Sequence, residues 1–279
     1  HKICNSLKQK CNFKHKGKIL SVIKKQKILK ISNLLVSQPQ PAGANSPYLD
    51  LAKKLHLKVD FRQFIKVEGV TTKEFRSQHI NFADFTAVIF TSKIGIDNYF
   101  AIAKETKFAV PETMKYFCST ESIALYLQKH ILYRKRKIFH GEKSVTEMTE
   151  AFKKNLTEKF LLIHGDVSSN EIPDFLEKMK IDYHKAMLYK TVSADLSDMK
   201  EKLSDFDMLV FFTPAGIKSL SENFPNFIQN DTKIAAFGLT TCEAVEKAGY
   251  RLDVKAPTKE DPSMTSAIEH FITALNKKK

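Results

Sequence analysis

Two short stretches decide the fold: residues 88–96 read VIFTSKIGI, and residues 210–217 read VFFTPAGI. Each is an apolar run, then a small hydroxyl residue, then Gly-Ile in a segment with helical spacing. Aligning Gly95 with Gly216 places Ser92 on Thr213. A continuous apolar run is typical of a parallel strand, because such strands are buried on both faces. The pair therefore predicts two copies of a strand followed by a helix.

The repeat extends on both sides of this pair. Residues 116–125 (YFCSTESIAL) match residues 236–245 (AFGLTTCEAV), and residues 160–189 share the order strand, loop, helix, strand with residues 33–65. Three matches in the same order indicate an internal duplication. Apolar runs alternate with helix-length segments throughout, which favours βαβ units and parallel sheets. Strands are expected at Leu34–Ser37, Leu57–Phe61, Ala87–Phe90, Tyr116–Cys118, Lys137–Phe139, Phe160–Ile163, Ala186–Tyr189, Met208–Phe212, Ile234–Phe237 and Leu252–Val254.

The duplication predicts two similar α/β domains. Residues 63–70 and 185–193 lie at the same place in each copy, and neither has helical spacing. We expect both to be extended segments that cross from one domain to the other, which would make a hinged pair with a cleft. The alternative is that they are ordinary edge strands.

Composition excludes several classes of protein. The chain has 279 residues, enough for two domains, and its 43% apolar and 27% charged shares are those of a globular protein. The longest apolar runs have about five residues, whereas a membrane-spanning helix needs about 20. The four Cys are scattered without metal-ligand spacing, which favours a reducing, cytoplasmic location.

The net charge of +14 is unevenly distributed, because residues 1–30 contain ten Lys and no acidic residue. We expect this basic leader to be disordered. It lacks the apolar stretch of a secretory signal. The alternatives are an extension outside the true protein and an arm that binds polyanions.

Missing motifs narrow the chemistry. The sequence contains no GxGxxG after the first strand, no GxxxxGK[ST], no GxSxG and no HExxH. The sequence therefore does not predict binding of a dinucleotide or of a nucleotide at a P-loop. It does not predict a serine hydrolase or a zinc protease either. The residues predict neither a metal site nor a cofactor.

The candidate binding residues follow the predicted strands. Parallel α/β domains bind ligands beyond the carboxyl ends of their strands, where helix N-termini attract anions. The loops there are rich in hydroxyls and small residues, and the candidates are Ser92, Lys93, Gly165, Thr213, Gly238, Thr240 and Thr241, with His164 as a weaker one. The alternative for any single loop is that its Ser or Thr simply caps a helix.

An ordered set of strings carries a family resemblance. The strings include SQPQPAGANSPYLDLAKK (37–54), DFRQFIKVEGV (60–70), KAMLYKTVS (185–193), AAFGLTTCEAV (235–245) and APTKEDPSMTSAI (256–268), together with the duplicated stretches. From about residue 31 to 275 they resemble uroporphyrinogen-III synthases, in particular the branch found in Bacteroidetes-like bacteria. No single string is specific, but the order is.

The resemblance implies a fold of two flavodoxin-like parallel α/β domains, joined by a two-stranded hinge with segment exchange between the halves. Residues 31–65 and 194–279 would form a discontinuous domain 1. Residues 66–193 would form domain 2, including the hinge strands, and residues 1–30 would precede both.

The resemblance also implies an activity. Hydroxymethylbilane, a linear tetrapyrrole with eight carboxylates, would lose water and close with ring D inverted to give uroporphyrinogen III, for haem, sirohaem or cobalamin synthesis. The family uses no cofactor and no metal. Such a chain is expected to be a cytoplasmic monomer that binds neither nucleic acid nor membrane.

Site residues are carried over by position. Tyr189 matches a tyrosine that would assist loss of the hydroxyl, and Thr240 and Thr241 match the GPTT turn that begins at Gly238. Ser92 matches the serine of FTS, and Thr213 stands where relatives have Ser in FFSP. Lys93 and Arg62 are candidate cationic contacts.

The sequence also departs from the family pattern. Leu239 replaces the Pro of GPTT, Cys118 and Glu121 replace the Gly and Thr of GxxTA, and an expected Arg near residues 165–170 is absent. These departures support an alternative, a non-catalytic two-domain protein that binds a tetrapyrrole or a small anion. A third possibility is a nucleic-acid or membrane-surface protein that acts through the leader.

Overall fold

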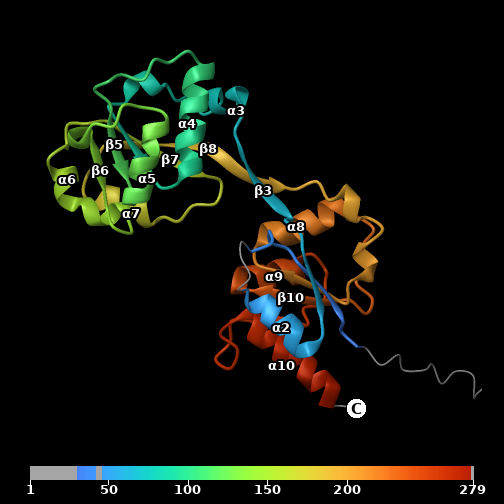
Figure 1. The fold of residues 1–279 in the computed structure, drawn as a ribbon. Helices are drawn as coiled ribbons and strands as arrows, with labels where there is room; N and C mark the ends of the chain where they lie inside the picture. Colours follow the sequence, from blue (N-terminus) through green and yellow to red (C-terminus); the bar gives the residue numbers. More distant parts are fainter. Residues whose placement is uncertain (1–29, 42–45, 278–279) are drawn as a thin grey trace, which may run out of the picture. The chain divides into compact units, whose positions relative to one another are not determined.

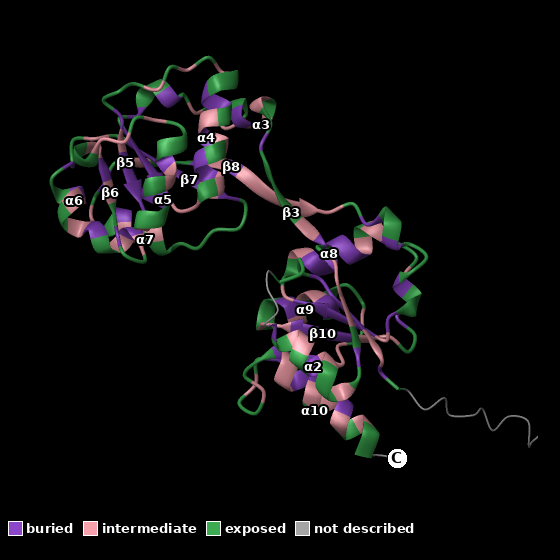
Figure 2. Cartoon of the chain, in the orientation of Figure 1, coloured by how far each residue is buried: buried purple, intermediate pink, exposed green. Residues whose placement is uncertain are grey.

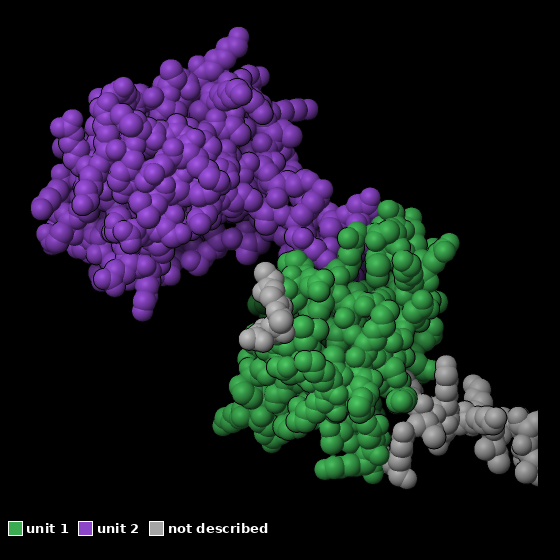
Figure 3. Space-filling model, in the orientation of Figure 1, with its two compact units in different colours: residues 1–62, 197–217, 224–279 green, residues 63–196, 218–223 purple. Residues whose placement is uncertain are grey.

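The computed structural model describes residues 30–41 and 46–277, which fall into two compact units (Figure 3). Unit 1 comprises the described residues up to Arg62 together with 197–217 and 224–277. Unit 2 comprises residues 63–196 and 218–223. The predicted basic leader lies outside the described residues except for Lys30, so its properties stay a prediction.

Unit 1 is built on a five-stranded parallel sheet in the order β11-β10-β9-β1-β2. Figure 1 labels its strand β10 and the helices α2, α8, α9 and α10. Its strands are β1 (Asn33–Val36), β2 (Lys58–Phe61), β9 (Met208–Phe211), β10 (Lys233–Phe237) and β11 (Val254–Ala256). Its helices are α2 (Pro47–Leu55), the first turn of α8 (Pro214–Asn223), α9 (Leu239–Lys247) and α10 (Met264–Lys277), with 3-10 turns η5 (Ser197–Met199) and η6 (Leu203–Asp205). Ile268 and Ile272 of α10 are buried in one core with Leu34 and Val210.

Unit 2 is built on a six-stranded sheet in the order β3-β8-β7-β4-β5-β6. Its strands are β3 (Ile65–Gly69), β4 (Ala87–Phe90), β5 (Lys115–Cys118), β6 (Ile138–His140), β7 (Phe160–Gly165) and β8 (Tyr183–Ser193). Its α-helices are α3 (Thr72–Arg76), α4 (Lys93–Glu105), α5 (Glu121–Tyr126), α6 (Thr149–Lys153) and α7 (Glu171–Lys178). Its 3-10 turns are η1 (Phe82–Asp84), η2 (Leu127–Lys129), η3 (Lys135–Lys137) and η4 (Val145–Met148).

The apolar run of β4 shows why the sequence folds this way. All four of its residues are fully buried, and Figure 2 shows buried residues in the neighbouring strands labelled β5 and β7. Because side chains alternate across a strand, Val88 and Phe90 pack in a core with residues of α4 and α5, while Ala87 and Ile89 pack in a second core with residues of α6 and α7. A run without polar residues is therefore required at this central position.

The two sheets share one strand order, as the duplication predicts. The order in unit 2 is β6-β5-β4-β7-β8, and the order in unit 1 is β11-β10-β9-β1-β2, so strands at the same place in the two orders correspond in the repeat. All neighbouring strands in these two orders pair in parallel. The predicted α/β fold with parallel sheets is confirmed.

The two segments expected to be extended are extended. β3 and β8 pair antiparallel, with Ile65 opposite Ser193 and Gly69 opposite Tyr189. β3 is an edge strand of the unit 2 sheet, and the chain leaves unit 1 just before it. A hinge at this ladder stays a prediction.

Candidate functional site

Unit 2 brings three of the predicted site residues together at the carboxyl edge of its sheet. Ser92 follows β4, Gly165 ends β7, and Tyr189 lies on β8 opposite Gly165. The strands β4, β7 and β8 are consecutive neighbours in the sheet. Residues from three distant parts of the chain therefore meet at one place.

A hydrogen-bond chain links the N-terminus of α4 to Tyr189. The Ser92 hydroxyl accepts from the Gly95 N–H at 3.1 Å, which caps the helix, and donates to the Tyr189 hydroxyl at 3.2 Å. A hydroxyl has a single proton to donate. Because Tyr189 accepts from Ser92, its own proton is free to be donated elsewhere.

Two glycines make room for the Tyr189 ring. A Cβ atom added at Gly165 would lie 2.4 Å from Cε2 of Tyr189, and one added at Gly95 would lie 3.5 Å from Cε1. The strand register also shifts between His164 and Gly165, which places Gly165 opposite Tyr189. The sequence identifies Gly95 only as an alignment point of the repeat, and its closeness to the ring emerges only from the three-dimensional structure.

Asp166 fixes the backbone on either side of this contact. Its N–H donates to the Tyr189 carbonyl at 3.2 Å, and its carboxylate accepts from the Thr191 N–H at 2.9 Å. His164, the weaker candidate, has its Nδ1 2.7 Å from the Gly165 carbonyl oxygen. The backbone at the half-buried Tyr189 is thus hydrogen-bonded to the residue that follows β7.

Lys93 begins α4 and is exposed. Its ammonium group lies 5.5 Å from the centre of the Tyr126 ring, within the range of a cation–π contact. The Tyr126 hydroxyl donates to Asp97 at 2.9 Å, and Asp97 also lies 2.9 Å from Nε2 of His130. This cluster holds the Tyr126 ring in place beside Lys93.

The capping geometry is repeated in unit 1. The Thr213 hydroxyl accepts from the Gly216 N–H at 3.2 Å, as Ser92 accepts from Gly95. The helix-cap alternative is therefore correct for both hydroxyls. Capping leaves the proton of the Thr213 hydroxyl available for a ligand, whereas the Ser92 proton is donated to Tyr189. Thr213 is exposed.

The predicted GPTT-like turn forms the start of α9. Gly238 is the N-cap with φ 86°, a left-handed conformation that favours glycine, and its N–H donates to the Ala256 carbonyl at 2.6 Å. Thr240 is exposed, whereas Thr241 is 1% exposed. The burial of Thr241 argues against ligand contact through its hydroxyl. The accessible hydroxyl of this turn is that of Thr240.

The first turn of α9 offers backbone donors as well. The first N–H groups of a helix have no partner within the helix and carry partial positive charge. Leu239, which stands where relatives have Pro, is 76% exposed at this turn. An anion is therefore favoured at the start of α9 for the same reason as at the start of α4.

Cys118 and Glu121 are the two residues of unit 2 that depart from the family pattern. Cys118 ends β5 fully buried, and burial raises the pKa of its thiol to about 12. It is a neutral core residue. Glu121 is exposed as the first residue of α5, where a carboxylate interacts favourably with the helix dipole.

Arg62 lies in unit 1 and forms an ion pair with Asp198 at 2.8 Å. Its guanidinium group is thus engaged within the unit. Among the described residues there is no group of three or more His, Cys, Asp or Glu side chains that could hold a metal ion. No helix in the described part of the chain is both long and apolar enough to cross a membrane.

One protein family matches most of the chain. The family model described as "Uroporphyrinogen-III synthase HemD" matches residues 48–266. A uroporphyrinogen-III synthase of Chlorobaculum parvum (strain DSM 263 / NCIMB 8327) is 28% identical over 117 residues, which are 40% of this chain and 48% of that protein. The match thus spans about half the length of that curated relative.

Solved structures of the same name are also similar. A mutant uroporphyrinogen III synthase of the extremely thermophilic bacterium Thermus thermophilus has 15% identity and a TM-score of 0.42, covering 88% of this chain and 99% of its own. The uroporphyrinogen-III synthetase of Helicobacter pylori 26695 has 16% identity and a TM-score of 0.48, covering 88% and 100%.

Proposed function

Because the chain belongs to the uroporphyrinogen-III synthase family, we propose that it is a cyclising hydro-lyase that converts hydroxymethylbilane to uroporphyrinogen III with inversion of ring D. The observation that carries this proposal is the family match, which covers more than three quarters of the chain. The product would enter haem, sirohaem or cobalamin synthesis. The reaction would need neither a cofactor nor a metal.

Substrate binding would rest on many weak contacts. The substrate has eight carboxylates, and an anion at a helix N-terminus gains only about 0.3–1 kcal/mol at an exposed site. We propose that the starts of α4, α8 and α9 bind carboxylates through backbone N–H groups, with help from the hydroxyls of Thr213 and Thr240, while the Ser92 hydroxyl donates to Tyr189. Lys93 would add a positive charge at the start of α4.

Tyr189 would assist the first chemical step. The hydroxyl of the substrate leaves with the electron pair of its C–O bond, and the pyrrole nitrogen stabilises the resulting azafulvenium cation. The Tyr189 hydroxyl would donate a hydrogen bond to the leaving oxygen. Since Tyr189 accepts a hydrogen bond from Ser92, the Tyr189 donor is strengthened by cooperativity.

Ring closure is a problem of orientation. Ring D must attack through its substituted carbon to form a spiro intermediate, whereas spontaneous closure gives the type I isomer. Holding both ends of the substrate in the reactive geometry lowers the entropic part of the barrier. Closure of two domains at a hinge would provide this control, and we propose that the two units are those domains.

The cysteines bear on the cellular location of the enzyme. We propose a monomer in the cytoplasm that does not bind nucleic acid or membranes. The scattered cysteines support a reducing compartment, and both described cysteines, Cys118 and Cys242, are free thiols.

Incubation with hydroxymethylbilane tests the activity. The type III product supports the synthase, whereas the type I isomer alone would favour the non-catalytic binding protein. Tyr189→Phe should lower kcat about 10- to 100-fold, the lower part of the range for general acid–base groups, with little change in KM. Tyr183→Phe is the matched control, because Tyr183 lies on the same strand and donates to Glu177 at 3.0 Å. Wild-type turnover by Tyr189→Phe would remove the proposed role.

A further inference from the structure

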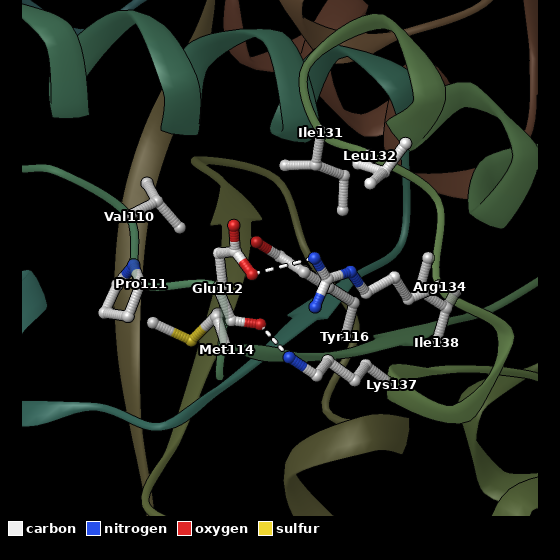
Figure 4. A pocket seen from close by; sticks show the side chains of 10 residues that line it. All are labelled: Val110, Pro111, Glu112, Met114, Tyr116, Ile131, Leu132, Arg134, Lys137 and Ile138. Atoms are coloured by element: carbon white, nitrogen blue, oxygen red, sulfur yellow. Dashed lines mark hydrogen bonds and ion pairs between the residues drawn. The ribbon is translucent and has the colours of Figure 1, made fainter.

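A pocket lies in unit 2, near the amino ends of β5 and β6. It has a volume of about 210 Å³ and is lined by the loop before β5 and by the segment that leads into β6 (Figure 4). These segments meet at the amino ends of the strands, whereas Ser92 and Gly165 follow carboxyl ends. The pocket is therefore separate from the site proposed for the synthase reaction.

The walls of this pocket are mainly apolar. They are formed by Val110, Met114, Tyr116, Ile131 and Ile138. Leu132 adds an apolar side chain that is 77% exposed. For scale, a closed apolar cavity of about 150 Å³ holds one benzene molecule. The volume thus suits one ring or two fused rings.

The same pocket carries positive charge. Arg134 forms an ion pair with Glu112 at 2.8 Å, and the Glu112 side chain is 80% exposed to water. The Lys137 ammonium donates to the backbone carbonyl of Glu112, and among the described residues it has no carboxylate partner within ion-pair distance. Lys135 and Arg136 add further positive charge nearby. An anionic group on a ligand would complete this arrangement.

We propose that this pocket binds a small aromatic carboxylate of one or two fused rings. The ring lies against the apolar wall that includes Val110, Ile131 and Leu132, and the carboxylate faces Lys137, while Arg134 stays paired with Glu112. An apolar cavity with a few polar groups that fix orientation is the usual form of a small-molecule site. This binding does not depend on the synthase reaction.

Binding of 2-naphthoate to the full chain tests the proposal by isothermal titration calorimetry. Lys137→Gln should weaken binding about tenfold, the effect of losing one well-placed charge contact. Lys135→Gln is the matched control. Lys135 lies two residues before Lys137 and carries the same charge, but its side chain does not line the pocket. The Lys135→Gln substitution should change the affinity less than about twofold. The tenfold loss expected for Lys137→Gln corresponds to about 1.4 kcal/mol.

Leu132→Glu provides a second variant with little risk to folding, because Leu132 is highly exposed. The added carboxylate should also weaken 2-naphthoate binding. The neutral analogue 2-naphthalenemethanol should bind the wild-type protein more weakly than 2-naphthoate and should be insensitive to Lys137→Gln. No binding of 2-naphthoate at millimolar concentration, equal losses in the two lysine variants, or equal affinity for the neutral analogue would each overturn the proposal.

Discussion

Gly165 and Tyr189 lie so close that a single added methyl group at residue 165 would overlap the aromatic ring, at 2.4 Å from Cε2 and 2.8 Å from Cδ2. The two residues face each other on the neighbouring strands β7 and β8. The position of the ring, and with it the position of the hydroxyl near Ser92, therefore depends on the absence of a side chain at residue 165.

Gly165→Ala should displace the Tyr189 ring. Overpacking of this kind lowers the free energy of unfolding by about 1–3 kcal/mol. Turnover should fall at least as far as in Tyr189→Phe, because the hydroxyl moves away from Ser92. Gly95→Ala is the control, since its nearest contacts would be 3.3 Å and it should cost less in both thermal unfolding and turnover. Equal effects of the two substitutions would contradict this account.

The start of α9 gives a prediction about substrate affinity. Thr240→Val removes an exposed hydroxyl and should raise KM about two- to fivefold, in line with one weak anion contact. Thr241→Val alters a side chain that is 1% exposed, so KM should stay close to the wild-type value. Steady-state kinetics of the two variants make the comparison. A larger rise of KM in Thr241→Val would show that the buried threonine shapes the turn.

Tyr99 predicts a gain in stability. Its side chain is fully buried among Phe82, Phe90 and Phe100, and its hydroxyl has no hydrogen-bond partner among the described residues. Tyr99→Phe should raise the free energy of unfolding by about 1 kcal/mol, because a buried polar group without a partner is costly. Urea unfolding would measure this.

Tyr126→Phe is the control for that measurement. The Tyr126 hydroxyl donates to Asp97 at the surface, so its loss should lower the free energy of unfolding by about 0.5–1.5 kcal/mol. Destabilisation by Tyr99→Phe would mean that the Tyr99 hydroxyl has a partner, such as a buried water molecule.

Glu74 predicts a pH dependence of stability. Its hydrogen bond to Lys190 and then its contacts with Thr71 lower the pKa of this carboxyl from 4.5 to about 2. Because the folded state holds the carboxyl proton less tightly than the unfolded chain, the stabilisation is fully present above pH 4.5 and is lost as the pH falls towards 2. The difference in Tm between the wild-type protein and Glu74→Gln should therefore shrink over this range.

Lys190→Gln provides an independent check of the cause. Removing the side chain that contributes most to the shift should move the pKa of Glu74 back towards 4.5, as measured by NMR titration. A constant Tm difference between pH 6 and pH 2 would show that Glu74 stabilises α3 only through its cap.

Most of the fold is predictable from local sequence, for physical reasons. The run at Ala87–Phe90 is apolar because both faces of the central strand are covered, and the same reason applies to Met208–Phe211. Each predicted strand overlaps an observed strand. Strand ends are less well predicted, because hydrogen bonds to neighbouring strands decide them. Tyr183–Ser193 is thus longer than its apolar centre suggests.

The site is less predictable than the fold. Residue type identifies Ser92 and Thr213 as helix caps or ligand contacts, and both do cap helices. The fit of the Tyr189 ring between Gly95 and Gly165 depends on the order of β4, β7 and β8, which local patterns do not contain. The sequence does not show which side chains of the site are exposed. The adjacent residues Thr240 and Thr241 are of the same type, but the first is exposed and the second is buried.

The interrupted course of unit 1 along the chain constrains how the protein can be made. During synthesis on the ribosome, β1 emerges long before β9, the strand that pairs with it on one side. The Ser32 N–H can donate to the Asp207 carboxylate only after another 175 residues have been added. Nearly all of unit 2 is synthesised in that interval. Domains generally fold as units during translation. The nascent chain can therefore form the sheet of unit 2 before the sheet of unit 1, which needs strands from the final third of the polypeptide.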